Sequence, residues 1–129
     1  MKKLISIFSL STLLLGADLK VYYDLDIAIS KAKVDKKEVI LYVYSTNCPW
    51  CKKMDKNTFK NSDVTNALNK NFIFVKLNKD IDDIPEELIP RYVPTTYILD
   101  SNQEEIFAMY GYKNANEFLR VLEDFRGDF

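Results

Sequence analysis

Two cysteines, Cys48 and Cys51, are the residues whose type and spacing point most directly to chemistry. They are the only cysteines of the chain, and Pro49 and Trp50 separate them. A run of apolar residues precedes the pair, and a charged segment with helical spacing follows it. A dithiol between the end of a buried strand and the start of a helix indicates a redox site, where one thiolate attacks a disulfide and the second thiol resolves the mixed disulfide.

The expected helix start gives the two thiols different roles. Pro49 suits the first turn of a helix, because the N–H that it lacks would have no partner there. Cys48 then stands at the helix end, where free N–H groups and the positive end of the helix dipole favour its thiolate. Cys51 lies about one turn inside and is the more buried of the two. We therefore predict that Cys48 attacks and Cys51 resolves.

Three other interpretations of the cysteine pair explain the sequence less well. A structural disulfide would close a very small loop, which constrains the unfolded chain little. A zinc or copper site needs more ligands, and the sequence has neither a third cysteine nor any histidine. Two ordinary core cysteines would not need a Pro-Trp spacer. The sequence therefore favours redox chemistry with no metal and no cofactor.

Length and composition describe one folded domain with a short appendage. The chain has 129 residues, of which 47% are hydrophobic, enough for a core. Its net charge is −1, from 18 basic and 19 acidic residues, with no long run of one sign. Nothing in this pattern indicates a surface that binds nucleic acid or an anionic membrane.

The first residues resemble a targeting segment. Met1-Lys2-Lys3 is basic, residues 4–15 are apolar and Gly16-Ala17 are small, which is the order of a secretory signal peptide. As a helix, residues 4–15 would cover about 18 Å, less than the roughly 30 Å of a bilayer core. We predict a cleaved signal over residues 1–17, although Leu15 is large for the −3 position, and a domain over residues 18–129. The alternative is a core helix with a lysine-rich start.

The remaining sequence alternates between strand and helix patterns. An N-cap at Asp24, the capping cluster Asn61-Ser62-Asp63 and Pro85 predict helix starts in addition to the one at Pro49. The last helix is expected over about 114–125. Strands are predicted over 19–23, 38–45, 71–78, 96–99 and 105–110, the last two joined as an antiparallel hairpin. The order β-α-β-α-α-β-α-β-β-α indicates an α/β domain with parallel strands early and a hairpin late.

Several motifs carry a family resemblance: Cys48-Pro49-Trp50-Cys51-Lys52 after a strand, Val75-Lys76-Leu77-Asn78-Lys79-Asp80, Val93-Pro94-Thr95 before a strand, and Gly111 before the final helix. Together they resemble the thioredoxin fold over essentially all of the mature chain. The resemblance implies a central mixed sheet of about four to five strands flanked by helices. The segments Cys51–Phe59 and Ser62-Asp63-Val64 resemble, more narrowly, exported thioredoxin-like proteins allied to the C-terminal periplasmic domain of the electron transporter DsbD.

The resemblance also implies roles around the cysteines. Pro94 matches the cis-proline of the family, which packs against the disulfide, and Val93 would offer its backbone groups to an extended substrate strand. The alternative for Pro94 is a plain turn proline. Trp50 is expected to be exposed beside Cys48, where it either contacts the partner or merely covers the helix start.

One position departs from the family pattern. Many thioredoxins have a buried aspartate six residues before the attacking cysteine, beside a lysine on the next strand. Lys76 matches that lysine, but the aspartate position holds Tyr42, whose phenol is a much weaker acid. Asp55 matches a carboxylate of the DsbD-like domain, so we hypothesise that it accepts the proton of Cys51, directly or through water, with Tyr42 and Lys76 nearby. The alternative is a solvated Asp55 paired with Lys52 or Lys56.

The direction of electron flow is predicted from the absence of histidine in the motif. The strongly oxidising periplasmic relatives have a histidine inside the motif, and this chain has none. We expect a periplasmic or otherwise exported monomer that reduces disulfides and is recharged by a membrane electron donor. Its clients would be mis-paired protein disulfides or apocytochrome c. The alternatives are a disulfide-forming oxidase, a client-binding module or chaperone, and a metallochaperone.

Overall fold

The computed structural model describes residues 18–126. The predicted signal peptide, residues 1–17, lies outside the described residues. The described chain contains no helix that combines the length and the apolar composition needed to cross a membrane. Its elements, in chain order, are β1 (Val21–Tyr22), α1 (Leu25–Asp35), β2 (Glu38–Tyr44), α2 (Pro49–Asn57), α3 (Ser62–Asn71), β3 (Phe72–Asn78), the 3₁₀ helix η1 (Glu86–Leu88), β4 (Thr95–Leu99), β5 (Glu105–Tyr110) and α4 (Ala115–Arg126).

Five strands form one mixed sheet in the order β1-β3-β2-β4-β5. β1 and β2 run parallel to β3, whereas β4 runs antiparallel to β2 and β5 antiparallel to β4. The predicted element order and the predicted hairpin are confirmed. β2 lies in the middle of the sheet, and its residues 39–43 are fully buried, as expected for a strand covered on both faces.

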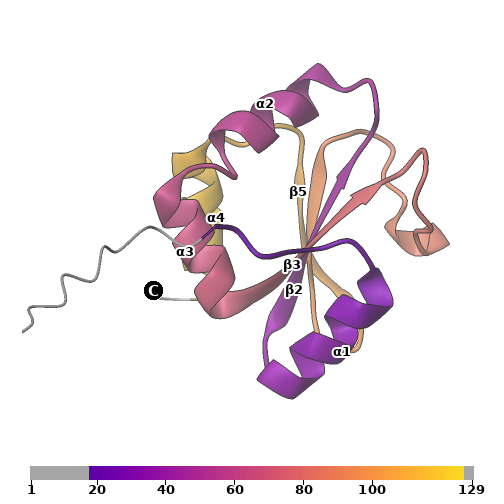
Figure 1. The fold of residues 1–129 in the computed structure, drawn as a ribbon, viewed down its shortest axis with the longest axis vertical. Coiled ribbons are helices and arrows are strands. Elements are labelled where there is room, and N and C mark those ends of the chain that lie inside the picture. The colour runs from indigo at the N-terminus through magenta and orange to yellow at the C-terminus, as the bar shows by residue number, and fades with distance from the viewer. Residues whose placement is uncertain (1–17, 127–129) are drawn as a thin grey trace, which may run out of the picture.

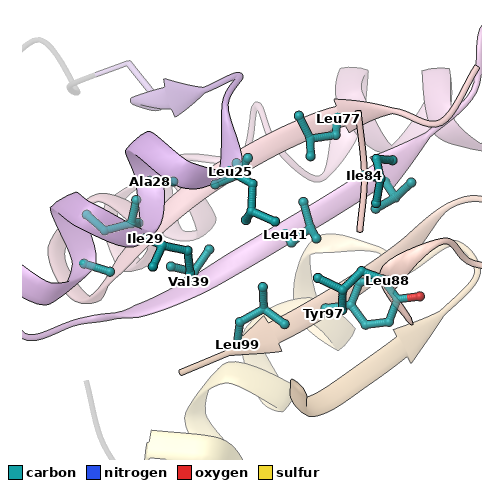
Figure 2. Close-up of a cluster of buried hydrophobic side chains, with 14 residues drawn as sticks. Leu25, Ala28, Ile29, Val39, Leu41, Leu77, Ile84, Leu88, Tyr97 and Leu99 are labelled. Carbon is teal, nitrogen blue, oxygen red and sulfur yellow. The ribbon is translucent and has the colours of Figure 1, made fainter. Parts of the chain in front are cut away.

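The helices divide into two layers around this sheet (Figure 1). The α1 side contains a mostly aliphatic cluster that includes Leu25, Leu41 and Leu77 (Figure 2). The opposite side, beneath α2, α3 and α4, contains a second cluster that includes Met54, Phe74 and Phe118. Each layer buries an apolar helix face against the sheet, which supplies the main stabilising term of the fold.

Side-chain caps set several helix starts. The Asp24 side chain accepts a hydrogen bond from the Ile27 backbone N–H at 2.9 Å, which confirms the predicted N-cap of α1. The side chain of Asn61 accepts hydrogen bonds from the N–H groups of Asp63 and Val64 at the start of α3. These bonds satisfy donors that have no partner within the helix.

The first strand is shorter than predicted. The pattern favoured residues 19–23, but only Val21 and Tyr22 pair with β3. The Lys20 backbone N–H donates to the Asn69 side chain at 2.9 Å, and that side chain also donates to the Asp18 carbonyl. Because α3 satisfies these backbone groups, the chain before Val21 is not hydrogen-bonded to the sheet.

Candidate active site

The cysteine pair lies at the start of α2, as predicted. Cys48 is the N-cap residue, with φ −128° and ψ 98°, and Pro49 occupies the first turn. The Cys48 sulfur accepts a hydrogen bond from the Cys51 backbone N–H at an N–Sγ distance of 3.1 Å. Sulfur therefore takes the place that an oxygen usually has in an N-cap, directly at the positive end of the helix dipole.

Cys48 and Cys51 form a disulfide, with 5.2 Å between their Cα atoms. Cys51 is 1% exposed and Cys48 is 5% exposed. Cys51 is the more buried residue, as the sequence predicts. Cys48 is less accessible than its attacking role suggests, because its sulfur is turned toward the backbone of the helix. A partner must therefore reach this sulfur from the rim of the site.

Val93 and Pro94 lie at the same end of the sheet as the disulfide. The Val93–Pro94 peptide bond is cis, as the resemblance implied. β4 begins at Thr95, which pairs with Val43 near the end of β2, and the cysteine pair follows that end. The Pro94 carbonyl accepts a hydrogen bond from the Gly111 N–H at 2.8 Å. Within residues 18–126 the backbone groups of Val93 make no hydrogen bond, so they are available to an added strand.

Trp50 is 56% exposed on the first turn of α2, which confirms its predicted exposure. Its ring lies 5.5 Å from the ring of Tyr112, measured between centroids. The Lys53 Nζ atom lies 5.0 Å from each ring centroid. Tyr112 and its contact with Lys53 were not predicted, because the contact depends on how the loop after β5 meets α2. The only local feature that could have drawn attention to Tyr112 was its position directly after Gly111, which belongs to a family motif.

Tyr42 lies beneath the resolving cysteine. Its side chain is fully buried, and its hydroxyl donates a hydrogen bond to the Cys51 carbonyl at 3.2 Å. Its ring packs edge-on against Phe59, with 4.8 Å between centroids. Burial raises the pKa of Tyr42 strongly, and the nearby charges of Asp55 and Tyr44 raise it further. Tyr42 is therefore a neutral hydrogen-bond donor in this position and not a proton acceptor.

Asp55 and Lys76 form an ion pair, with 2.8 Å between Asp55 Oδ1 and Lys76 Nζ. Lys76 reaches this place because it pairs in register with Tyr42, so both side chains point to the α2 face of the sheet. The alternative pairing of Asp55 with Lys52 or Lys56 is wrong, since the carboxylate is bound to β3. The two side chains are 35% and 22% exposed, so solvent still reaches the pair. The role of Asp55 in proton transfer stays a prediction.

The chain is similar to known proteins in sequence and in fold. Residues 25–126 match the family described as thioredoxin-like domain. The chain belongs to this family. A thioredoxin from Thermus thermophilus is 25% identical and superposes with a TM-score of 0.71, over 85% of this chain and 88% of that one. The oxidised C-terminal domain of DsbD from Neisseria meningitidis is 21% identical with a TM-score of 0.62, over 81% and 98% of the two chains, and at this identity it shows the fold alone.

Among curated proteins, spermatogenesis-associated protein 20 from Rattus norvegicus is 34% identical over 53 residues, which cover 41% of this chain. The match covers 7% of that protein, so its activity as a whole says little about this thioredoxin-like domain. The same protein from Mus musculus is 36% identical over 53 residues, with the same coverage.

A cavity of about 590 Å³ opens beside the ion pair of this thioredoxin-like domain. Asp55 and Lys76 line it together with residues of β1, α3 and β3, among them Val21, Thr65 and Phe74. The cavity was not predictable from local patterns, because its walls come from segments that are far apart in the sequence. It gives the carboxylate of Asp55 access to solvent.

Metal ligands do not gather in the part of the chain that the structure describes. No group of three histidine, cysteine or carboxylate residues there could hold a metal ion. The chemistry available to the described site therefore consists of the two sulfurs, the Asp55 carboxylate, the Lys76 ammonium and the Tyr42 hydroxyl.

Proposed function

We propose that this protein is an exported thiol–disulfide oxidoreductase that reduces disulfides in client proteins. The observation that carries the proposal is the Cys48 sulfur at the N-cap of α2, 3.1 Å from the Cys51 backbone nitrogen. In the reduced protein the same N–H group and the helix dipole stabilise a thiolate on Cys48. A stabilised thiolate beside a second thiol is what disulfide exchange requires.

The reaction proceeds in two exchanges. The Cys48 thiolate attacks one sulfur of the client disulfide, forming a mixed disulfide and releasing the other client sulfur as a thiolate. The Cys51 thiol then loses its proton, and its thiolate attacks the Cys48 sulfur. This step forms the Cys48–Cys51 disulfide and releases the second client thiol. Two electrons pass from the protein dithiol to the client.

Asp55 is proposed as the group that receives the Cys51 proton. Tyr42 cannot serve, because its raised pKa keeps the phenol protonated. The Asp55 carboxylate lies one helical turn after Cys51, is held by Lys76 and faces the solvent of the adjacent cavity. A water molecule can therefore carry the proton between Cys51 and Asp55, with Lys76 fixing the carboxylate and Tyr42 fixing the Cys51 peptide.

Client binding is proposed at the rim formed by Val93, Pro94 and Trp50. The unpaired backbone groups of Val93 can accept an extended client segment as an added strand. Trp50 supplies an exposed ring beside Cys48, where an aromatic residue can contribute much of the contact energy. Both contacts place a client sulfur against the Cys48 sulfur, which is itself nearly buried.

The reducing direction and the export are proposed from the sequence. The motif contains no histidine, and residues 1–17 resemble a signal peptide. A reductant in an oxidising compartment must be recharged, so a membrane electron donor is the proposed partner. Mis-paired protein disulfides and apocytochrome c are the proposed clients, and a monomer is the proposed working form.

Trapping of clients in the native compartment tests this function. A Cys51→Ser variant should accumulate mixed disulfides with client proteins, because the resolving thiol is missing, whereas a Cys48→Ser variant should accumulate none. Thiol labelling of the wild-type protein should find it mainly reduced. A mainly oxidised pool would indicate the oxidase instead, and full biological activity of Cys48→Ser would indicate a binding module or chaperone.

Asp55→Asn tests the proton acceptor. The variant should form mixed disulfides at the normal rate but resolve them at least about tenfold more slowly near neutral pH, since a positioned acid–base group contributes 10²–10⁴-fold. Stopped-flow measurement of the two steps separates them. Asp63→Asn, an exposed carboxylate in the first turn of α3, is the matched control. An unchanged rate of resolution in Asp55→Asn would eliminate this role.

A further inference from the structure

The outer side of α2 carries positive charge that no carboxylate of residues 18–126 neutralises. Lys52, Lys53 and Lys56 are exposed on the helix, and Lys60 follows it. The three ion pairs of the described residues are formed elsewhere, by Lys31 with Asp35, Lys76 with Asp55 and Arg126 with Glu38. The whole chain has a net charge of −1, so this excess of positive charge is local to the active-site helix.

One of these lysines is held next to the disulfide by aromatic rings. The Lys53 Nζ atom lies 5.0 Å from the ring of Trp50 and 5.0 Å from the ring of Tyr112. Contacts with ring faces attract the ammonium group but leave its N–H donors without an acceptor. A lysine that is already ordered loses less side-chain entropy when it binds an anion. Lys53 is therefore preorganised to bind a carboxylate beside Cys48.

The opposite side of the cysteine pair carries negative charge. Asp80 accepts a hydrogen bond from the backbone N–H of Thr46, at 3.0 Å, and this places the loop after β3 beside the segment that leads to Cys48. Asp80, Asp82 and Asp83 are all exposed on this loop. The active site thus lies between a basic helix and an acidic loop, on either side of the end of β2 (Figure 1).

We propose that the surface formed by Trp50, Lys52, Lys53, Lys56 and Tyr112, here called the lysine–aromatic surface, binds an acidic segment of the client polypeptide next to its disulfide. The proposal rests on the proposed function, since the client is the disulfide substrate. Charge complementarity selects a polypeptide rich in aspartate or glutamate. The loop at residues 80–83 repels the same segment, so the client binds in one direction across the site.

Model clients with one disulfide and different flanking residues test the proposal. One peptide has a run of glutamates before its cysteine pair, and an isomer has the same run after the pair. Two further peptides have glutamines or lysines in place of the glutamates. Oxidation of the reduced protein by each peptide is followed through the fluorescence of Trp50, the one tryptophan of the chain. The measured quantity is the second-order rate constant at low and at high ionic strength.

The acidic peptides should react faster than the lysine peptide, by about tenfold at low ionic strength, because complementary charge raises the encounter rate. One of the two glutamate isomers should react faster than the other. High salt should reduce these differences, because the Debye length falls to about 3 Å at 1 M. Lys52→Glu combined with Lys53→Glu should reverse the preference between the acidic and lysine peptides.

Lys33→Glu is the matched control, because Lys33 is an exposed lysine of α1, on the other side of the sheet. Like each of the two substitutions on α2, it replaces a lysine by a glutamate. It should leave the preference for acidic peptides over the lysine peptide unchanged. Equal rates with the glutamate and lysine peptides would contradict the proposed binding of acidic segments by the lysine–aromatic surface. They would not contradict the proposed oxidoreductase function. Failure to react with any peptide would overturn the proposed function instead. Equal rates together with lysine-dependent binding to phosphatidylglycerol vesicles would assign the surface to a membrane.

Discussion

The two faces of the sheet are built from different kinds of side chain. The cluster beneath α1 consists almost entirely of leucine, isoleucine, valine and alanine, with Tyr97 as its aromatic member (Figure 2). The cluster beneath α2, α3 and α4 is rich in aromatic residues and methionine, with Tyr42, Met54 and Phe59 close to the active-site helix. We call these two clusters the aliphatic face and the aromatic face.

Neighbouring residues of β2 belong to different faces and have different tasks. Leu41 packs into the aliphatic face, whereas Tyr42 packs into the aromatic face and donates a hydrogen bond to the Cys51 carbonyl. The side chains of a strand alternate between faces, so one strand can support both the fold and the site. The aliphatic face therefore contributes stability, whereas the aromatic face also determines the position of the cysteines.

The largest expected effect comes from removing buried volume on either face. Leu41→Ala and Met54→Ala should each lower the free energy of unfolding by about 2–5 kcal/mol, since both side chains are fully buried. Only Met54→Ala should also change the rate of disulfide exchange, because Met54 packs the active-site helix α2 against the sheet. Urea unfolding and exchange kinetics measure the two effects. A changed exchange rate in folded Leu41→Ala would contradict the division between the faces.

A smaller effect is expected for the Tyr42 hydroxyl. Tyr42→Phe keeps the ring but removes the hydrogen bond to the Cys51 carbonyl, so stability should fall by about 1 kcal/mol. The variant should also slow the resolution of mixed disulfides, since the Cys51 peptide is held less firmly. Tyr97→Phe is the control on the aliphatic face and should leave the exchange kinetics unchanged. Equal kinetics in Tyr42→Phe and wild type would limit Tyr42 to a packing role.

Alkaline pH should reveal the buried phenol of the aromatic face. Burial raises the pKa of Tyr42 above its ordinary value, so above about pH 10 the unfolded chain releases a proton that the folded chain keeps. The free energy of unfolding should therefore fall as pH rises above this value, by up to about 1.4 kcal/mol per pH unit for each such tyrosine. Tyr42→Phe should make this fall less steep. Urea unfolding across the alkaline range measures it, and an unchanged slope would place the Tyr42 phenol in contact with solvent.

The sequence was sufficient for most of the fold because its signals were local. The apolar run of β2 and the caps at Asp24 and Asn61 predicted their elements correctly. The start of the sheet was wrong by two residues, because Asn69 of α3 satisfies the backbone of Lys20. A hydrogen bond between residues so far apart in the chain leaves no periodic pattern that could be read.

The same distinction applies to the site. The cysteine pair and the exposure of Trp50 followed from their positions on one helix start, and Pro94 followed from a motif. The resemblance placed Lys76 near Asp55, and their ion pair confirms this proximity; spacing along the helix alone left Lys52 and Lys56 as alternative partners, and only the register of β3 decides between them. Register and loop docking are tertiary properties, and a sequence without known contacts does not define them.

The smallest expected effect concerns a hydroxyl of the aromatic face. Thr96 pairs in register with Tyr42 and is fully buried, and within residues 18–126 its Oγ1 atom has no hydrogen-bond partner. A buried hydroxyl without a partner lowers stability, so Thr96→Val should raise the free energy of unfolding by up to about 1 kcal/mol.

Thr95→Val is the matched comparison, because Thr95 is equally buried but its hydroxyl donates to the Tyr92 carbonyl at 2.8 Å. It should lower the free energy of unfolding by about 1 kcal/mol through the lost bond. Urea unfolding of both variants, with the cysteines oxidised and then reduced, measures the two changes in the free energy of unfolding. If Thr96→Val were destabilising, the Thr96 hydroxyl would have a hydrogen-bond partner in solution, and the aromatic face would contain no buried hydroxyl without a partner at this position.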